Sequence, residues 1–190
     1  MNHEHNDKGP LGFWIYLMTD LLMFAVFFAT FAVLRNNTAG GISMKEIFDP
    51  PFVLAETLIL LTSSFTCGLA MLATHKNNKT KVLLWLTITF LLGLTFLGFE
   101  YTEFSHLIHE GHTWQQSAFL SSFFTLVGAH GLHIIAGSLW LFIMIVQIVR
   151  KGLTQGNLHK LTLLSIFWHF LDIVWIFIFT IVYLFGGIYA

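Results

Sequence analysis

Acidic and histidine side chains recur three residues apart at three places in this chain. The pairs are Glu100 with Glu103, His130 with His133, and His169 with Asp172. Residues three apart in an α-helix share one face. Carboxylate and imidazole groups ligate metals and transfer protons, so each pair could do chemistry if its segment is helical. Two further acids, Asp20 and Glu56, stand singly within apolar stretches.

The segments that carry these residues are too apolar for a soluble protein. The chain has 190 residues, of which 56% are hydrophobic and 10% are charged, whereas an ordinary soluble domain carries about 25% charged residues. This composition excludes a soluble globular enzyme, a disordered tail and a nucleic-acid-binding protein. The single cysteine, Cys67, excludes an intrachain disulfide and a thiolate metal cluster.

Five stretches are long enough to cross a bilayer as helices, which takes about 20 mostly apolar residues. Their apolar runs are continuous rather than alternating, which indicates helices and not strands. We therefore predict an all-α integral membrane protein, a bundle of five transmembrane helices that forms a single domain over residues 1–190. Helices that are neighbours in the sequence should be antiparallel neighbours in space, because their loops are short. The predicted spans are residues 11–34, 51–74, 82–104, 118–149 and 161–185.

The basic residues lie outside the apolar centres of the spans and predict the orientation. Seven of the nine Lys and Arg residues fall on one side, at Lys8 and in the connections after the second and fourth spans. The other side carries only Arg35 and Lys45. The positive-inside rule places the N-terminus in the cytoplasm and the C-terminus outside, as an odd number of spans requires.

No Lys or Arg lies deep enough in a span to balance the acids. An ionisable group inside a bilayer is costly unless it is paired or hydrated. The economical arrangement is for the three polar pairs to face one another inside the bundle. The predicted intramembrane polar network consists of Asp20, Glu56, Glu100, Glu103, His130, His133, His169 and Asp172.

Spacing alone leaves three functions open for these residues. A redox metal or haem site would use the histidines with the carboxylates, but di-iron bundles carry Glu-x-x-His motifs, which these pairs match only loosely. A transporter would need acids along a crossing path, and no broken-helix pair or inverted repeat is visible. The third function is a polar network that fixes helix packing.

A further set of histidines, His106, His109 and His112, follows the third span. If this segment is helical, the three imidazoles form one face that could take a metal ion. The alternatives are a solvated helix end and a contact with another subunit.

Four segments resemble subunit III of the haem–copper terminal oxidases. Residues 128–138, GAHGLHIIAGS, resemble the G-x-H-G-x-H-x-x-x-G segment of that family, and residues 167–175, FWHFLDIVW, resemble its W-H-F-x-D-x-x-W segment. Glu100 and Glu103 resemble its E-x-x-E helix end, and Asp20 after Gly12-Phe13-Trp14 resembles its intramembrane acid. The resemblance covers nearly the whole chain in order.

The number of spans narrows the resemblance to one branch. Mitochondrial-type members have seven spans, and this chain lacks the first two, which is similar to the bacterial quinol oxidases. Residues 12–18, 38–41 and 76–79 look especially like the cytochrome o ubiquinol oxidase branch. A menaquinol oxidase or a cytochrome c oxidase is the alternative within the family, and a stand-alone proton-coupled transporter is the alternative outside it.

The resemblance implies a non-catalytic accessory subunit of a proton-pumping oxidase in the bacterial cytoplasmic (inner) membrane. The whole complex would oxidise ubiquinol and reduce oxygen to water in aerobic respiration. It implies no catalytic, cofactor-binding or metal-ligating residue in this chain, with haem, copper and ubiquinol held by partner subunits. The implied partners are oxidase subunits I and II, a small subunit IV and membrane lipids, including a structural phospholipid, but no nucleic acid.

Overall fold

The computed structural model describes residues 8–40 and 49–185, and the regular structure within these ranges is entirely helical. Gly41 and Lys45, which entered the sequence analysis, lie outside these ranges. Five helices of the described part are long and apolar enough to cross a membrane, which confirms the predicted all-helical fold with five spans. The last of them continues from α6 into a π-helical segment, η1. The elements are α1 (Lys8–Leu34), α3 (Pro50–His75), α4 (Lys79–His109), α5 (Ala118–Lys151), α6 (Gln155–Ile178) and η1 (Phe179–Leu184).

Local sequence signals set most helix ends. Pro50 and Pro51 open α3, where the missing backbone N–H groups of proline cost nothing. Gly152 ends α5 with a φ angle of 73°, a conformation that a residue without a Cβ adopts freely. A side-chain oxygen caps the start of three helices by accepting a backbone N–H. These caps are Asn78 before α4, Ser117 before α5 and Thr154 before α6.

The third helix, α4, runs past the predicted end of its apolar stretch. The span was expected to stop at residue 104, but the helix continues to His109. Leu107 explains the extension, because its side chain is buried in the core and holds the additional turn against the bundle. Gly111, at a φ angle of 85°, lies in the turn that follows.

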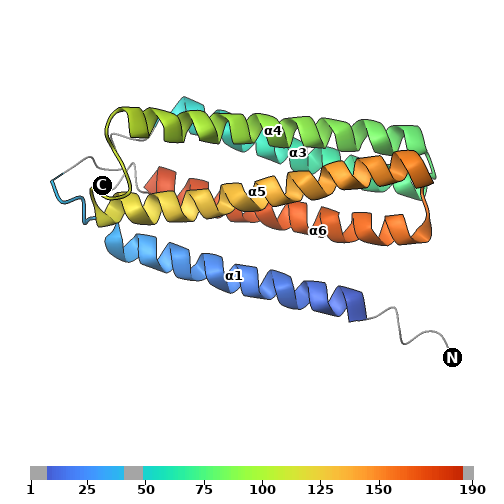
Figure 1. Cartoon of the computed structure of the whole chain (residues 1–190), viewed down its shortest axis with the longest axis horizontal. Helices are drawn as coiled ribbons and strands as arrows, with labels where there is room; N and C mark the ends of the chain where they lie inside the picture. The colour runs from blue at the N-terminus through green and yellow to red at the C-terminus, as the bar shows by residue number, and fades with distance from the viewer. Residues whose placement is uncertain (1–7, 41–48, 186–190) are drawn as a thin grey trace.

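Four of the helices form a closed antiparallel bundle. Packing contacts join α3 to α4, α4 to α5, α5 to α6 and α6 back to α3, so the four axes enclose one core (Figure 1). Two apolar clusters fill it, one around Trp175 and Phe123 and the other around Trp168 and Leu86. The core therefore runs the length of the bundle.

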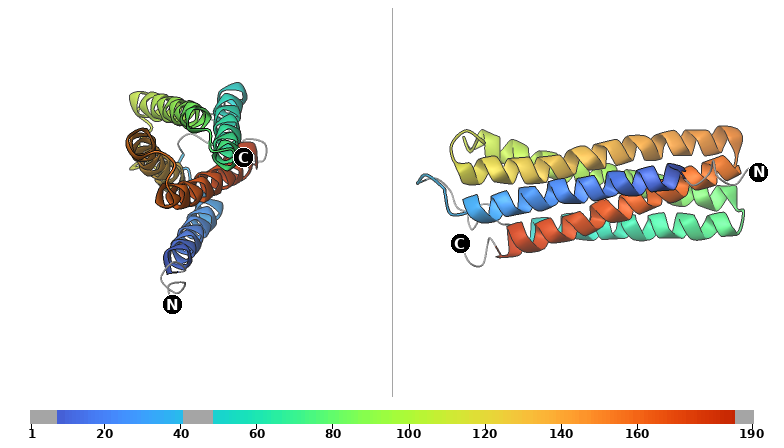
Figure 2. Two further views of the ribbon diagram at one scale, coloured as in Figure 1. Left: turned by 90° about the vertical axis from the view of Figure 1, so that its right-hand side faces the viewer. Right: turned by 90° about the horizontal axis from the view of Figure 1, so that it is seen from below.

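The helix α1 lies outside this ring. It packs against α5 and α6, and its N-terminal half diverges from them, as the end-on view in Figure 2 shows. The prediction that sequence neighbours pack together is thus wrong for α1 and α3, which are not among the principal packing pairs of the described residues. The long connection between them, from Arg35 to Asp49, removes the constraint that a short loop imposes.

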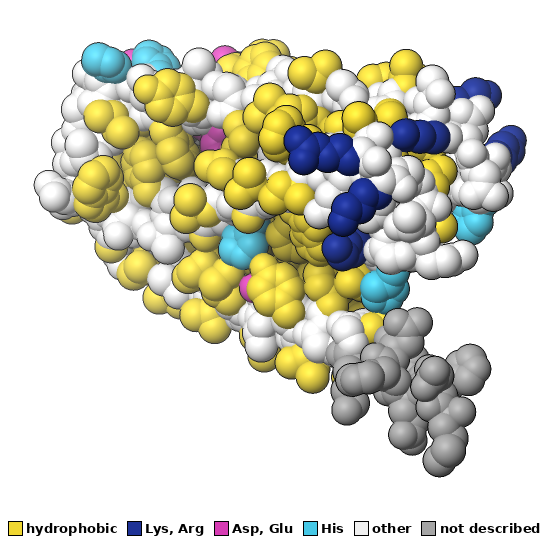
Figure 3. Space-filling model, turned by 45° about the vertical axis from the view of Figure 1, so that its right-hand side comes forward, with side chains coloured by type: hydrophobic (Ala, Val, Ile, Leu, Met, Phe, Trp, Pro, Cys, Tyr) yellow, Lys and Arg dark blue, Asp and Glu magenta, His cyan; other side chains and the backbone are white. Residues whose placement is uncertain are grey.

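Basic side chains gather at one end of the molecule (Figure 3). The connections α3–α4 and α5–α6 meet there, and Lys79 Nζ donates a 3.0 Å hydrogen bond to the backbone oxygen of Val149. The start of α1 lies at this same end, and η1 finishes at the opposite one (Figure 1). The charge asymmetry seen in the sequence is therefore a property of the folded molecule.

Candidate functional site

The eight residues predicted as one polar network occupy four places, distinguished by the contacts that each group makes. The glutamate and histidine pairs approach each other where Glu100 lies against Gly131, the residue after His130. The places are the carboxyl cluster of Glu56, Glu100 and Glu103, the pair of Asp20 and His133, the groove residues His169 and Asp172, and the enclosed His130.

The carboxyl cluster joins α3, α4 and η1. Tyr183 Oη donates to Glu103, at 2.9 Å from Oε2 and 3.1 Å from Oε1. Glu56 lies close enough to Glu103 and Glu100 for their charges to interact, and both of its carboxyl oxygens are buried without a hydrogen-bond partner among the described residues. Three carboxylates so close together repel one another, and no Lys or Arg of the described residues lies among them to offset the repulsion.

One member of the carboxyl cluster borders a hollow at the end of the bundle. Glu103 lines it together with Asp49 and His106, and its volume is about 320 Å³. Glu103 is only partly buried, whereas Glu56 is fully buried and Glu100 nearly so. Water can therefore reach the cluster from one side, and Glu103 is the carboxyl group best placed to carry charge.

Gly131 allows the carboxyl group of Glu100 to lie against α5. A Cβ atom at position 131 would collide with both carboxyl oxygens and the carboxyl carbon of Glu100. The residue that follows His130 therefore has to be small for α4 and α5 to pack with Glu100 between them. The close approach of Glu100 is thus a structural reason for a glycine at position 131, within the motif of residues 128–138.

His130 is enclosed by aromatic rings and not by ligands. Its ring lies 5.3 Å from that of Trp175 and 5.9 Å from that of Phe96, centroid to centroid. The residue has no exposed surface, and neither ring nitrogen has a hydrogen-bond partner in the described part of the chain. In this position His130 acts as a packing group at the centre of the bundle.

Asp20 and His133 connect α1 to α5. His133 Nδ1 lies 2.7 Å from the backbone oxygen of Ala129, one turn earlier, so Nδ1 carries a proton and donates it to this carbonyl. His133 Nε2 then faces Asp20 Oδ2 at 3.6 Å. A neutral imidazole with its proton on Nδ1 offers only a lone pair at Nε2, so the two groups attract each other when they share one additional proton.

The third place lies between α3 and α6. Ser64 Oγ and His169 Nδ1 are 2.6 Å apart, and Asp172, one turn after His169, interacts with both of them. The two members of this helical pair do share a face, as their spacing predicts. They meet a hydroxyl group on α3 and not the carboxyl or histidine pairs of the other helices.

Several polar contacts between helices involve residues that the sequence analysis did not select. Trp175 Nε1 donates to Thr57 Oγ1 at 3.1 Å, and Trp168 Nε1 donates to Ser63 Oγ at 3.1 Å. The two tryptophans pack on one face of α6, as their spacing of seven residues predicts. A run of hydroxyl residues, T62-S63-S64 with Thr66, in the middle of an apolar span was the available signal for the α3 side. Nothing in the sequence pointed to Tyr183.

The histidine segment after the third span does not form one helical face. His106 and His109 are exposed on the last turns of α4, and His112 follows the end of that helix. His106 Nε2 lies 3.5 Å from Glu110 in an exposed ion pair. Among the described residues, no three His, Cys, Asp or Glu side chains are grouped so that they could hold a metal ion.

These groups have one kind of chemistry in common. They bind protons and form hydrogen bonds between helices. Carboxyl, imidazole, hydroxyl and indole groups meet across the contacts of α3 with α6, of α4 with η1 and of α1 with α5. Inside a bilayer, such contacts supply helix association that lipid-like apolar surfaces cannot.

Comparison with known proteins gives a consistent result over the full length. The sequence profile of the family described as cytochrome c oxidase subunit III matches residues 5–187. A Pseudomonas aeruginosa protein named cytochrome bo(3) ubiquinol oxidase subunit 3 is 57% identical over 189 residues, which are 98% of this chain and 90% of the relative.

More distant relatives carry related names. Quinol oxidase subunit 3 of Bacillus subtilis is 47% identical over 176 residues, 93% of this chain and 86% of the relative. Cytochrome c oxidase subunit 3 of Bacillus sp. strain PS3 is 45% identical over 176 residues, 93% of this chain and 85% of the relative. On this evidence, the chain belongs to the cytochrome c oxidase subunit III family.

Proposed function

We propose that this chain is the non-catalytic subunit III of a proton-pumping ubiquinol oxidase. The complex would transfer electrons from ubiquinol to oxygen and form water. The observation that carries the proposal is the 57% identity, over 189 residues, to a protein named as subunit 3 of a ubiquinol oxidase. The quinol-oxidase names of the Bacillus relatives at 47% identity agree with it.

In the proposed complex, the redox centres lie in other subunits. Haem, copper and ubiquinol would be bound by subunits I and II, and a small subunit IV would complete the assembly. The histidines and acids of this chain support this division of labour, because the contacts they make are with aromatic rings, hydroxyl groups and one another. Their proposed role is to fix the packing of the five helices.

The proposed site of the complex is the bacterial cytoplasmic membrane, with the N-terminus of this chain in the cytoplasm and its C-terminus outside. The basic end of the molecule supports this orientation (Figure 3), because cytoplasmic ends of membrane proteins carry an excess of Lys and Arg. The whole chain, residues 1–190, would form one membrane domain.

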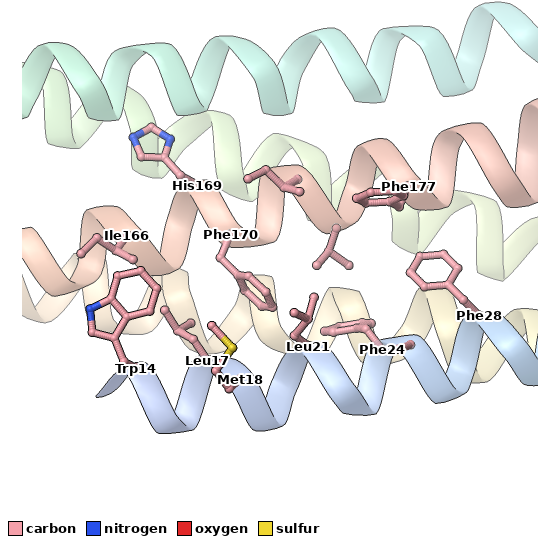
Figure 4. Close-up of a pocket in the computed structure, with 13 residues that line it drawn as sticks. Trp14, Leu17, Met18, Leu21, Phe24, Phe28, Ile166, His169, Phe170 and Phe177 are labelled. Atoms are coloured by element: carbon pink, nitrogen blue, oxygen red, sulfur yellow. The ribbon is translucent and has the colours of Figure 1, made fainter. Parts of the chain in front are cut away.

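A cleft between α1 and α6 suits the expected structural phospholipid. Its volume is about 590 Å³, and its walls are almost entirely apolar, with Trp14, Leu21 and Phe170 among them. The side chains of α1 and α6 face each other across it (Figure 4). An acyl chain needs no hydrogen bonds from its surroundings, so it could fill this space where α1 diverges from the bundle.

The direct test is purification of the complex through an affinity tag on this chain in a mild detergent. We expect larger haem-bearing subunits to co-purify, together with oxygen consumption that ubiquinol supports and reduced cytochrome c does not. Recovery of the chain alone, or of a complex that oxidises only cytochrome c, would contradict the proposal. A purified chain that moves protons or a solute in liposomes by itself would favour a transporter instead.

A further inference from the structure

A largely apolar groove with three polar side chains in its wall lies between α3 and α6, at the middle of both helices. Ser64, His169 and Asp172 line it, and its volume is about 440 Å³. Ser64 is close to the centre of the span Pro50–His75, and His169 is at the centre of the span Gln155–Leu184. The three polar side chains therefore lie at the depth where a bilayer is driest.

The hydrogen bonds of this groove are incomplete. Ser64 Oγ and His169 Nδ1 satisfy each other at 2.6 Å, and this is the hydrogen bond that the His169 ring makes within the described residues, so Nε2 is left without one. Asp172 Oδ1 also lacks a partner there. Whichever tautomer His169 adopts, Nε2 is left as either a donor or an acceptor. Lipid chains offer neither, and an unsatisfied polar group in hydrocarbon costs free energy.

The groove has unsatisfied polar groups in its wall, and in this it differs from the neighbouring cleft between α1 and α6. His169 borders both hollows, but in Figure 4 its ring points away from α1, toward α3. The other walls of the cleft are apolar, which suits an acyl chain. The groove presents an imidazole, a hydroxyl and a carboxyl group within one helical turn, next to the exposed apolar side chains of Leu61, Phe65 and Leu72. A protein helix can satisfy both kinds of surface, whereas a lipid chain can satisfy only one.

We propose that the α3–α6 groove is the docking surface for a transmembrane helix of another oxidase subunit. That helix would place a hydrogen-bonding side chain, such as a hydroxyl or amide, against His169 Nε2 at mid-membrane. Its apolar side chains would cover Leu61, Phe65 and Leu72. This inference rests on the proposed function, because it needs a multi-subunit complex, but it adds which face of the chain makes the contact.

Photo-crosslinking in the intact complex tests the docking surface directly. A benzophenone-bearing residue replaces Phe65 in the groove, and in a separate variant it replaces Leu91, an equally central and exposed residue of α4. We expect the position-65 probe to form an adduct with another subunit several times more often than the position-91 probe. Lipid adducts alone at position 65, or equal protein yields at both positions, would overturn the proposal. Because the complex is isolated first, failure here leaves the proposed function standing.

A variant series tests the hydrogen bond at the centre of the groove. We expect His169→Leu to reduce the amount of this chain retained per haem on detergent dilution by about threefold or more, the scale of one interhelical hydrogen bond in a membrane. His169→Gln keeps a hydrogen-bonding group and should recover part of that loss. The control His75→Leu makes the same chemical change at the exposed end of α3. Equal retention of the His169→Leu and His75→Leu variants would overturn the role of His169.

Discussion

The first and last spans of this chain differ in how they are held. In an apolar stretch of 18 residues within the last span, 50% of the residues are buried inside the molecule, compared with 22% in the corresponding stretch of α1. In the described part of the chain, α6 packs against α3, α5 and α1, whereas the principal packing partners of α1 are α5 and α6. The last span is therefore embedded in the ring of four helices, whereas most of the surface of α1 is left for lipid or another subunit to cover.

The tryptophans of α6 and α1 differ in burial in the same way as the two helices do. Trp175 and Trp168 on α6 have at most 1% of their surface exposed, and each donates an indole hydrogen bond to a hydroxyl group of α3. Trp14 on α1 is 50% exposed and lines the cleft between α1 and α6. Residues of one type therefore serve the interior of the bundle in α6 and its membrane-facing surface in α1.

The largest expected effect comes from removing a tryptophan of the bundle. Trp175→Ala should lower the free energy of unfolding of the isolated chain in detergent by about 3–5 kcal/mol, because it opens a large cavity between α3, α4 and α6. It also removes the hydrogen bond to Thr57. Reversible unfolding, followed by circular dichroism, measures the change.

Trp14→Ala is the matched control on α1. Its side chain is half exposed, so the same substitution should change the free energy of unfolding by no more than about 0.5 kcal/mol. Comparable losses for the two variants would show that α1 is as firmly integrated as α6, which would break the comparison.

A smaller effect is expected where α1 is attached to the bundle. Asp20 and His133 approach to 3.6 Å across the contact between α1 and α5. A double-mutant cycle with Asp20→Leu and His133→Leu should give a favourable coupling energy below about 0.6 kcal/mol, the average for hydrogen-bonded pairs within membranes, because 3.6 Å is longer than a hydrogen bond. The cycle needs the free energy of unfolding of four proteins, which thermal unfolding supplies. These are the unchanged chain, the two single variants and the double variant.

Asp20→Asn sharpens this prediction. An amide can donate a hydrogen bond to His133 Nε2 without an additional proton, so this variant should keep most of the coupling. A coupling energy of zero for the Leu cycle would mean that the pair contributes nothing to the attachment of α1.

The parts of this fold that follow local rules could be predicted from the sequence. Five apolar runs gave five spans, because a bilayer forces long apolar segments into helices. The face shared by His169 and Asp172 followed from helical periodicity alone. The end of α4 could not be read in the same way, because it depends on Leu107 packing into a core that the sequence does not display.

The partners of the polar residues could not be predicted, because they depend on how whole helices are arranged. Glu103 meets Tyr183, which lies 80 positions further along the chain, and His169 meets Ser64, which lies 105 positions earlier. His133 meets Asp20 because α1 packs against α5 from outside the ring of four helices. Spacing thus identifies which residues share a face but not what that face meets.

The central claim is that this chain is a structural subunit of an oxidase complex and binds none of the redox centres of that complex. The most direct test is to separate the chain from the purified complex and measure its haem absorbance and its iron and copper content. We predict no haem spectrum and no stoichiometric metal in the chain, with both present in the remaining subunits. One haem, iron or copper per chain would contradict the account.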